Sequence, residues 1–428
     1  WFAGHGDGFH LCFSLALTVR KGQVILHFLA VEQQKLFHKN ALIHIAHRFA
    51  LPCFFGVCPV MNRHLCLRSL ALLDEHAVAD LEAFGQVLRQ ILEQRKSQTE
   101  EFVKLFCAVN PDKLYLIGSG TSLNAERAAA GYMETMLDVD VCAVPSSRIP
   151  QLRGERPMVV FISQGGSSTN TLQAMEQLAD YPSISITGEA ECEIRRRSSH
   201  HMLIGCGEEL AGPKTVGYTA SVLCFYICAL EAALAAGTIG PDKYDAEIGV
   251  LDLAVNQMEE NIRRTEAWFR RNQDELVQIR KYVLVGCGSA FAAATEGCLK
   301  ILETIKVPSM SFEFEEYLHG PIILTDRELG GVFYISDAPG ERERMMELAR
   351  CHAHFSPYAY MVTTDESIQG AKVLHALRTG HDHTQIFEAV LLPQLLAARV
   401  PELLGLAEGS PAYDLYTKNC PTKYNNGR

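Results

Sequence analysis

Hydroxyl-bearing residues gather in two glycine-containing segments of the sequence, and each segment follows a short apolar run. The segments are Gly118-Ser119-Gly120-Thr121-Ser122 and Ser163-Gln164-Gly165-Gly166-Ser167-Ser168. A glycine-containing turn between a strand and a helix presents backbone amides at the helix N-terminus, which suits a phosphate group. Ser and Thr commonly do no more than cap helices. Because two such loops occur in consecutive strand–helix units, we favour binding over capping alone, and the hydroxyls predict a sugar phosphate as the ligand.

A Gly-x-Gly turn is weak evidence for any particular nucleotide. The dinucleotide fingerprint needs a third glycine, but Leu123 and Phe291 stand at that place in the two Gly-x-Gly turns of this chain. The lysine-bearing phosphate loop of nucleotide hydrolases is missing as well. The two loops therefore favour neither a dinucleotide nor a nucleoside triphosphate.

A second group of residues has the types that move protons. Lys300 and Glu303 lie three residues apart in a helical pattern, and His319 follows 16 residues after Glu303. An enclosed carboxylate and an imidazole can each act as general acid or base near neutral pH. The alternatives are a solvated Glu303 that pairs with Lys300 at i, i+3, and a structural histidine. The pairs His352/His354 and His381/His383 invite a metal site, but we expect surface or loop histidines there.

Strands alternate with helices around these residues, which predicts a parallel sheet covered on both faces. The expected strands are Lys113–Ile117, Val141–Val144, Met158–Ile162, Ser183–Thr187 and His201–Ile204, followed later by Lys281–Val285, Gly331–Ile335 and Tyr358–Thr363. The unit of strand, Gly-x-Gly turn and helix that starts at Lys113 is repeated 168 residues later at Lys281. We therefore expect an α/β protein made by internal duplication, with two doubly wound parallel sheets.

The expected domains follow from this repeat. Residues 75–238 form the first domain with a leading helix, and residues 279–428 form the second with a C-terminal tail. Residues 239–278 connect them, within a charged stretch that suggests a helical hairpin over 242–280. Residues 1–74 receive no assignment and are interpreted as an extension outside the functional domains.

The charge of the chain excludes some classes of function. The 39 Lys and Arg against 50 Asp and Glu give −11, and −14 remains when the first 60 residues, at +3, are set aside. No cationic excess is available to neutralise nucleic-acid phosphates. The 14 cysteines form no Cys-x-x-Cys pair, so zinc ribbons are not supported and reduced thiols in a cytoplasmic protein are expected.

Neither a membrane span nor a signal peptide is expected. The apolar stretch Ser221–Ala236 is short for a span and is better explained as a buried helix. The run Leu11–Val19 lacks the basic segment before it and the small-residue cleavage site after it that a signal peptide would have.

Taken together, the motifs resemble those of the sugar isomerase (SIS) domain. The paired copies are similar to the isomerase half of glucosamine-6-phosphate synthase and to the fructosamine-6-phosphate deglycases, over roughly residues 75–428. The segments Leu299–Ile305 and Phe314–Pro321, the second with its His-Gly-Pro sequence, carry the more specific part of the likeness. The resemblance implies two flavodoxin-like SIS domains.

The resemblance also implies roles for individual residues. Glu303, on the helix that carries Lys300, would shuttle a proton between C1 and C2 of an open-chain sugar. His319 would promote ring opening, often from the partner subunit of a homodimer. A lysine of the C-terminal tail, Lys418 or Lys423, could form an imine with the substrate. The implied phosphate and sugar ligands are Ser119, Gly120, Thr121, Ser122, Ser163, Gln164, Ser167, Ser168 and Thr219.

The chain departs from the family pattern in two places. Gly165 stands where the synthase has a serine, which removes a hydroxyl that would contact phosphate, whereas Ser168 keeps the hydroxyl of the family's threonine. After Ala211-Gly212-Pro213 the usual Thr-Lys pair is missing, and only Thr219 is carried over.

The favoured function is deglycation of a fructosamine (ketosamine) 6-phosphate to a hexose 6-phosphate and a free amine. The alternatives are aldose–ketose isomerisation, deamination of glucosamine 6-phosphate, and, in another class, a sugar-phosphate sensor that binds without turnover. We expect no metal, no organic cofactor, no nucleic-acid or membrane partner and no glutaminase activity.

Overall fold

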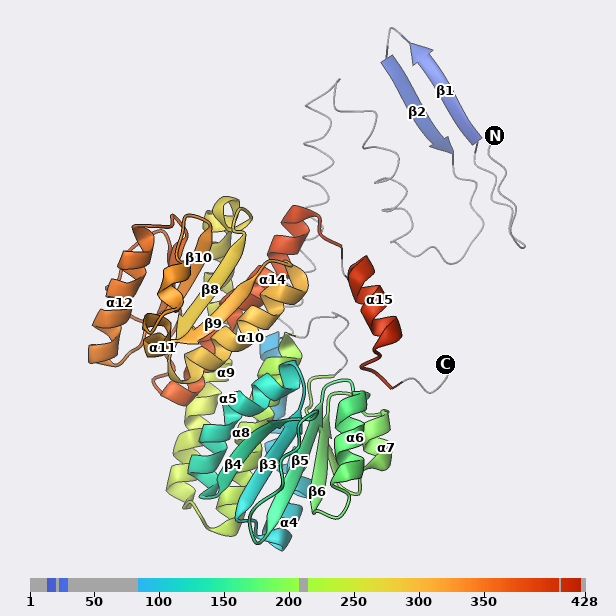
Figure 1. Cartoon of the computed structure of the whole chain (residues 1–428), viewed down its shortest axis with the longest axis vertical. Helices are drawn as coiled ribbons and strands as arrows, with labels where there is room; N and C mark the ends of the chain where they lie inside the picture. Colours follow the sequence, from blue (N-terminus) through green and yellow to red (C-terminus); the bar gives the residue numbers. More distant parts are fainter. Residues whose placement is uncertain (1–13, 21–22, 30–83, 208–214, 408, 425–428) are drawn as a thin grey trace. The chain divides into compact units, whose positions relative to one another are not determined.

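The computed structural model describes residues 14–20, 23–29, 84–207, 215–407 and 409–424 (Figure 1). The chain divides into two units, residues 1–75 and 76–428. In the first unit, strands β1 (Ser14–Arg20) and β2 (Gln23–Leu29) pair in antiparallel fashion. Most of the segment 1–74, to which the sequence assigned no function, lies outside the described residues.

The second unit begins with a five-stranded parallel sheet whose strands are short and apolar. They are β3 (Lys113–Gly118), β4 (Asp140–Pro145), β5 (Pro157–Ser163), β6 (Ser183–Thr187) and β7 (His201–Leu203), in the spatial order β4-β3-β5-β6-β7. Side chains alternate between the two faces of a strand. Leu114 and Leu116 of β3 thus enter the main core, and Tyr115 and Ile117 enter a smaller core under α6.

Helices cover both faces of this first sheet. They are a helix over residues 84–93, α3 (Arg95–Gln98), α4 (Glu100–Val109), α5 (Thr121–Leu137), α6 (Thr169–Gln177), α7 (Glu193–Arg197) and α8 (Val216–Ala236). Among the described residues, α8 is the one helix long and apolar enough to cross a membrane, but 83% of its most apolar window is buried against the rest of the fold. It packs on α4 and α5, which is the arrangement expected of a core helix.

The connector to the second sheet is a single helix, α9 (Pro241–Leu276). The expected hairpin over 242–280 is therefore wrong. Pro241 lies in the first turn of α9, where the missing N–H costs nothing, and a Cβ at Gly249 would meet open space. Because neither residue imposes a turn within the stretch, the helix runs through its full 36 residues.

The second sheet repeats the first. Its strands are β8 (Lys281–Gly286), β9 (Ser309–Glu313), β10 (Leu329–Tyr334), β11 (Ala359–Thr363) and β12 (Val373–His375), all parallel and in the order β9-β8-β10-β11-β12. Its helices are α10 (Gly288–Thr304), α11 (Phe314–Leu318), η1 (Pro321–Leu324), α12 (Pro339–Ala353), η2 (Asp382–Thr384), α13 (Gln385–Ala389), α14 (Leu391–Leu404) and α15 (Pro411–Asn419).

The order of strands is the same in both sheets when β8 is matched to β3. This identity confirms the expected α/β class with two doubly wound parallel sheets and the duplication that the sequence suggested. One hydrophobic core contains residues of both halves, such as Leu116 from β3 and Leu284 from β8. The two sheets therefore hold each other in place, and loops from one can meet helices from the other.

Candidate functional site

The first hydroxyl-rich loop lies between β3 and α5. Gly120 has φ +59°, a conformation that suits glycine, and α5 begins directly after it at Thr121. A Cβ at Gly118 would lie 2.5 Å from Oε1 of Glu126, so the backbone approaches α5 more closely than any other residue would allow. Ser119 Oγ accepts a hydrogen bond of 2.7 Å from Nδ2 of Asn170 on α6. This bond ties the first loop to the start of the helix that follows the second loop.

The second hydroxyl-rich loop leaves β5, the neighbour of β3. The hydroxyls of Ser163 and Ser168 face each other at 3.1 Å. Ser168 is the N-cap residue of α6, yet its side chain makes no capping hydrogen bond with the helix. Helix capping by the Ser168 side chain, the alternative to ligand binding, is therefore not observed in this loop. Because β3 and β5 are paired and parallel, the two loops leave the same edge of the sheet, which is the usual place for a ligand in this class of fold.

Two residues of the predicted set point elsewhere. Gln164 Nε2 lies 3.0 Å from Sγ of Cys206, so its side chain turns away from the hydroxyls of Ser163 and Ser168. Thr219 is 1% exposed within α8, and its Oγ1 accepts a 3.3 Å hydrogen bond from Gln394 Nε2. Among the described residues, the Thr219 side chain makes no hydrogen bond with either hydroxyl loop. The preceding segment Ala211–Pro213 lies outside the described residues.

Helix α10 of the second half reaches the first loop. Lys300 Nζ donates a 3.1 Å hydrogen bond to Thr121 Oγ1 and lies 2.6 Å from an oxygen of Glu303. Lys300 is buried, with 2% of its side chain exposed, whereas 41% of the Glu303 side chain is exposed. The predicted pair of lysine and glutamate is thus joined to a predicted ligand loop that lies 179 residues earlier in the chain.

A further carboxylate, which the motif search missed, completes this group. Glu296 is fully buried one turn before Lys300; it accepts hydrogen bonds from Thr121 Oγ1 at 3.0 Å and from Asn124 Nδ2 at 2.8 Å. Its Oε1 lies 3.4 Å from Lys300 Nζ. Burial raises the pKa of Glu296, while Lys300 and the two hydrogen bonds oppose the shift. The signal was the spacing i, i+4, i+7 of residues 296, 300 and 303, which places all three on one helix face.

His319 lies apart from this group within the chain. It ends α11 as an exposed residue, and its backbone N–H bonds to the carbonyl of Glu316. Among the described residues, no hydrogen bond or ion pair joins its ring to Glu303. Next to it, Ile322, Ile323 and Leu324 are exposed by 41%, 88% and 44%.

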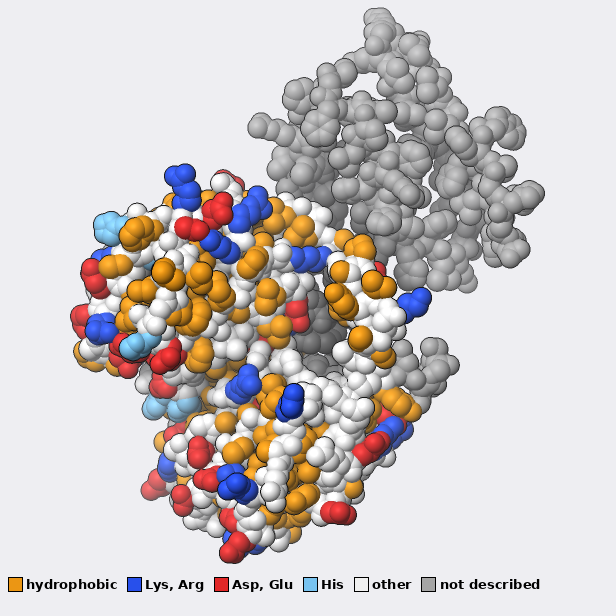
Figure 2. All heavy atoms as spheres, viewed as in Figure 1, with side chains coloured by type: hydrophobic (Ala, Val, Ile, Leu, Met, Phe, Trp, Pro, Cys, Tyr) orange, Lys and Arg blue, Asp and Glu red, His pale blue; other side chains and the backbone are white. Residues whose placement is uncertain are grey.

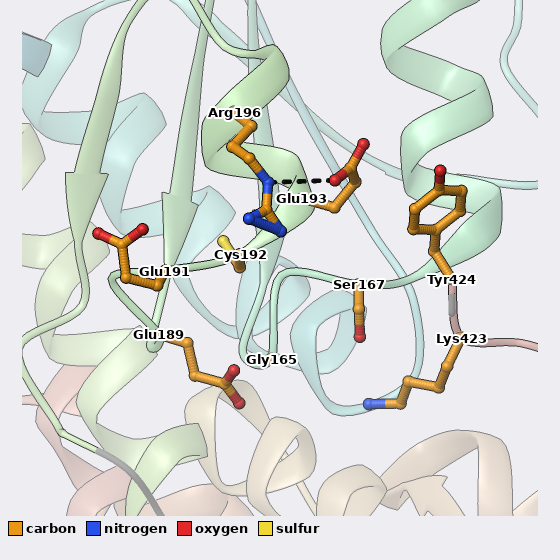
Figure 3. Close-up of a pocket in the computed structure, with 9 residues that line it drawn as sticks. All are labelled: Gly165, Ser167, Glu189, Glu191, Cys192, Glu193, Arg196, Lys423 and Tyr424. Carbon is orange, nitrogen blue, oxygen red and sulfur yellow. Dashed lines mark hydrogen bonds and ion pairs between the residues drawn. The ribbon is translucent and has the colours of Figure 1, made fainter. Parts of the chain in front are cut away.

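The C-terminal tail returns to the second loop. Lys423 forms an antiparallel bridge with Ser168, and Lys423 lines a pocket of about 200 Å³ together with Gly165 and Ser167 (Figure 3). Lys418 instead lies exposed in the last turn of α15. Of the two tail lysines that the sequence left open, Lys423 is the one that the structure brings to a hydroxyl loop.

Glu303 lines a larger cleft. This cleft has a volume of about 910 Å³ and is lined by α10 at Leu302 and Glu303, by α14 around Leu395, and by Tyr413 of α15. Glu303 does not line the pocket of Lys423, and Lys423 does not line the cleft of Glu303. Lys423 thus lies beside the second hydroxyl loop, and Glu303 is connected to the first hydroxyl loop through Lys300.

The corresponding edge of the second sheet carries acids beside its hydroxyls: Ser336 Oγ donates a 2.8 Å hydrogen bond to Glu341, and Ser289 Oγ donates one to the carbonyl of Asp382. A Cβ at Gly288, in the turn after β8, would lie 2.6 Å from Oδ1 of Asp382, and Cys287 contacts Glu341. Burial, followed by the nearby carboxylate of Glu341, raises the pKa of Asp382 despite the opposing influence of His383. No cluster of three or more potential metal ligands occurs in the described part of the chain. In the described part of this edge the hydroxyls are thus already bonded to acidic residues, a setting that suits a phosphate less well than the loops of the first copy.

No protein-family model matches the sequence. Curated relatives include the isomerizing glutamine–fructose-6-phosphate aminotransferases of Streptococcus agalactiae, 26% identical over 221 residues, and of Methanosarcina mazei, 24% identical over 220 residues. Each match covers 50% of this chain and 36% or 35% of the relative. The match therefore spans little more than a third of the length of these relatives.

Solved structures match over more of the chain. A protein assigned as a phosphosugar isomerase from Clostridium difficile 630 has a TM-score of 0.74 and 27% identity, and the match covers 82% of this chain and 99% of that one. The C-terminal domain of glucosamine-fructose-6-phosphate aminotransferase from Francisella tularensis shares the fold, with a TM-score of 0.63 at 17% identity over 76% of this chain and 98% of that domain. With its duplicated sheets and these matches, the chain is a tandem SIS-fold protein related to the phosphosugar isomerases.

Proposed function

We propose that this chain is an enzyme that acts on the open-chain form of a sugar 6-phosphate by moving a proton between C1 and C2. The observation that carries the proposal is the contact chain Glu303–Lys300–Thr121, with distances of 2.6 and 3.1 Å. These contacts link the half-exposed carboxylate of Glu303 to the first hydroxyl loop, which is suited to bind the phosphate. A base so tethered can reach the carbons of a substrate whose phosphate is bound a few ångströms away.

Deglycation of a ketosamine 6-phosphate is the reaction that we favour. Glu303 takes a proton from C1 of the ketosamine, which gives an enolamine, and returns a proton to C2, which gives an imine at C1. Water then adds to the imine, and the hexose 6-phosphate and the free amine separate. The cleft beside Glu303, at about 910 Å³, lies near the upper end of the ~300–1,000 Å³ range of small-molecule pockets, which leaves room for the amine substituent.

A homodimer would supply the histidine that the single chain does not. His319 is followed by exposed Ile322, Ile323 and Leu324. Contiguous exposed apolar side chains of this kind mark interaction sites. We propose that this surface contacts a second copy of the chain and that His319 reaches the partner's cleft, where it promotes opening of the sugar ring.

Turnover assays separate this function from its alternatives. Fructose 6-phosphate, glucosamine 6-phosphate and a panel of fructose-amino-acid 6-phosphates are each incubated with the protein, and products are identified by mass spectrometry. Release of amine from a fructose-amino-acid 6-phosphate is expected. Conversion of fructose 6-phosphate alone would identify an isomerase, loss of ammonia from glucosamine 6-phosphate a deaminase, and tight binding without turnover a sensor.

Substitution of Glu303 tests the proton-transfer role. Glu303→Gln keeps the size of the side chain, and turnover should fall by about 10²–10⁴-fold, as is usual when a positioned acid–base group is removed. The matched control is Glu328→Gln, an exposed glutamate of the same half whose side chain makes no hydrogen bond or ion pair with a described residue. Turnover of Glu303→Gln within a few-fold of the wild type would contradict the assignment.

A further inference from the structure

Gly165, in the middle of the second hydroxyl-rich loop, lies between two side chains of opposite charge. A Cβ at this position would lie 3.6 Å from Nζ of Lys423 and 3.3 Å from Oε1 of Glu189. Figure 3 shows the ends of these two side chains converging beside Gly165 from opposite sides of the pocket. A charged ammonium group therefore lies within reach of the place that a side chain at residue 165 would occupy.

The backbone of the tail holds Lys423 there. Thr169 N–H donates a 3.0 Å hydrogen bond to the carbonyl of Thr422, and Tyr424 N–H donates one of 2.7 Å to the carbonyl of Ser167. The guanidinium of Arg197 lies 5.2 Å from the ring centre of Tyr424, within the range of a cation–π contact. Because successive side chains of an extended segment point in opposite directions, this anchoring of Tyr424 directs Lys423 toward Gly165.

The approach to this anchor has few other contacts. Lys306 of the second half donates hydrogen bonds to the carbonyls of Ala407 and Gly409, just before α15. Helix α15 itself exposes Tyr413, Leu415 and Tyr416 by 61–70%, and Figure 2 shows hydrophobic side chains gathered at its place. The tail is therefore held at both ends of α15, and its C-terminal attachment is to the loop of Ser167 and Ser168.

Charge pairing leaves Lys423 available to an anion. Two of the acids around the pocket have their own partners, since Glu193 pairs with Arg196 at 3.2 Å and Glu191 lies 3.6 Å from Arg195. Among the described residues, neither Lys423 nor Glu189 has an ion-pair partner within 4.0 Å. An ammonium group that shares a pocket with the hydroxyl-bearing Ser167 is a suitable set of ligands for a phosphate.

We propose that Lys423 is a phosphate ligand of the sugar-phosphate site, whose ammonium group supplies the contact that a hydroxyl at residue 165 would otherwise make. This inference rests on the proposed function, because it takes the hydroxyl loops as the phosphate site. It places the phosphate near Gly165 and the reacting carbons near Glu303. Lys423 then selects phosphorylated sugars and does not form an imine with the sugar carbonyl.

The test compares binding of three probes by titration calorimetry: fructose 6-phosphate, inorganic phosphate and unphosphorylated fructose. Lys423→Met should weaken fructose 6-phosphate and inorganic phosphate by about 10-fold or more, as expected for loss of a charge-assisted hydrogen bond. The affinity for fructose should not change. Lys423→Arg should stay within a few-fold of the wild type, and Lys243→Met, which removes an exposed lysine at the start of α9, serves as the control for charge removal.

A second substitution tests whether the lysine replaces a hydroxyl. Gly165 has an ordinary negative-φ backbone, and the atoms nearest its Cβ are the ends of flexible side chains, so Gly165→Ser can be accommodated. The double variant Gly165→Ser/Lys423→Met should recover several-fold of the phosphate affinity that Lys423→Met loses. Glu189→Gln should tighten phosphate binding by a few-fold, because it removes a negative charge that repels the negatively charged phosphate.

Other outcomes would overturn the proposal. Unchanged phosphate affinity in Lys423→Met would do so, as would an equal loss for fructose and fructose 6-phosphate, or a loss in Lys418→Met instead. A borohydride-reduced adduct of fructose 6-phosphate on Lys423 would show an imine and refute the phosphate role. Phosphate binding that depends on Lys423, without turnover of any sugar phosphate, would support this inference and refute the proposed enzyme. A wild-type protein that binds none of the three probes would refute both.

Discussion

Lys300 Nζ lies 3.1 Å from Thr121 Oγ1, so a buried cation of the second α/β half is hydrogen-bonded to the first hydroxyl loop of the other half. The same ammonium group contacts Glu296 and Glu303, at 3.4 and 2.6 Å. Lys300 thus compensates a buried carboxylate on one side and holds the half-exposed one on the other. Lys300 therefore connects Glu303 to the first hydroxyl loop, and Glu296 adds a second connection through Thr121 and Asn124.

Removal of Lys300 should therefore cost stability as well as activity. Lys300→Met leaves Glu296 without its cation, and breaking a buried pair in this way typically costs about 3–5 kcal/mol. Because Lys300 lowers the pKa of Glu296, the variant should raise that pKa further, and the loss of stability should be smaller at pH 5.5 than at pH 8. Urea unfolding at both pH values measures this.

The control is the double variant Glu296→Gln/Lys300→Met, which removes the buried charge altogether. It should be more stable than Lys300→Met alone at pH 8 and should show less difference between the two pH values. Equal stabilities of the single and double variants at pH 8 would mean that Glu296 is not left charged by the loss of Lys300.

Donation of His319 between subunits predicts complementation of two inactive proteins. Glu303→Gln and His319→Asn should each have little activity alone. In a mixed dimer, the Glu303 of one chain meets the intact His319 of the other, so one of the two sites is complete. With half of the dimers mixed, about a quarter of the wild-type activity should return after the two variants are unfolded and refolded together.

Activity that stays at the level of the separate variants would place His319 and its own Glu303 in one site of the same chain, or would show that the chain is monomeric. Sedimentation of the wild type and of Ile323→Glu distinguishes these two cases. The substitution puts a charge on the exposed apolar surface beside His319 and should dissociate a dimer that uses it.

Much of the fold was predictable because the relevant signals are local. Short apolar runs, glycine turns and amphipathic helices predicted eight of the ten strands of the two sheets with ends shifted by no more than two residues, including the two that carry the hydroxyl loops. Strand β9 (Ser309–Glu313) was missed because it alternates Ser, Met and Phe and is only partly buried along its length. The hairpin expected over 242–280 was wrong because charge patterning alone does not locate a turn, and the stretch forms the single helix α9.

The site was less predictable because its contacts join distant residues. Glu296 could be found only from its helix spacing, and its bonds to Thr121 and Asn124 cross more than 170 residues of sequence. The pairing of Ser168 with Lys423 has no local signal at all. Gln164 shows the converse, since its position in the loop was predicted while its side chain turned to Cys206 through packing that no motif records.

Gly166 should not tolerate a side chain, whereas Gly131, an exposed glycine in helix α5, should. It has φ +58°, and a Cβ would lie 2.2 Å from Sγ of Cys192. Gly166→Ala should therefore lower the free energy of unfolding by about 2–3 kcal/mol and displace the second loop, which weakens phosphate binding. The control Gly131→Ala lies in α5, where a Cβ meets open space, and should stabilise the protein by about 0.5–1 kcal/mol. Thermal unfolding compares the two, and equal effects would contradict the close contact with Cys192.

Glu388 should make the protein less stable as the pH rises. Burial, with the nearby carboxylate of Asp337 as the next cause, raises the pKa of Glu388 from 4.5 to about 8. A carboxyl group with a higher pKa in the folded than in the unfolded state binds its proton more tightly when folded. Its contribution to stability is complete below pH 4.5 and is lost as the pH rises to about 8.

Glu388→Gln cannot ionise, so the variant should lose this part of the pH dependence, on the order of a few kcal/mol between pH 4.5 and 8.5. Urea unfolding across this range should show a steeper decline for the wild type and for the control Glu328→Gln than for Glu388→Gln. Parallel curves would show that Glu388 is already ionised in the folded protein at the lower end of the range.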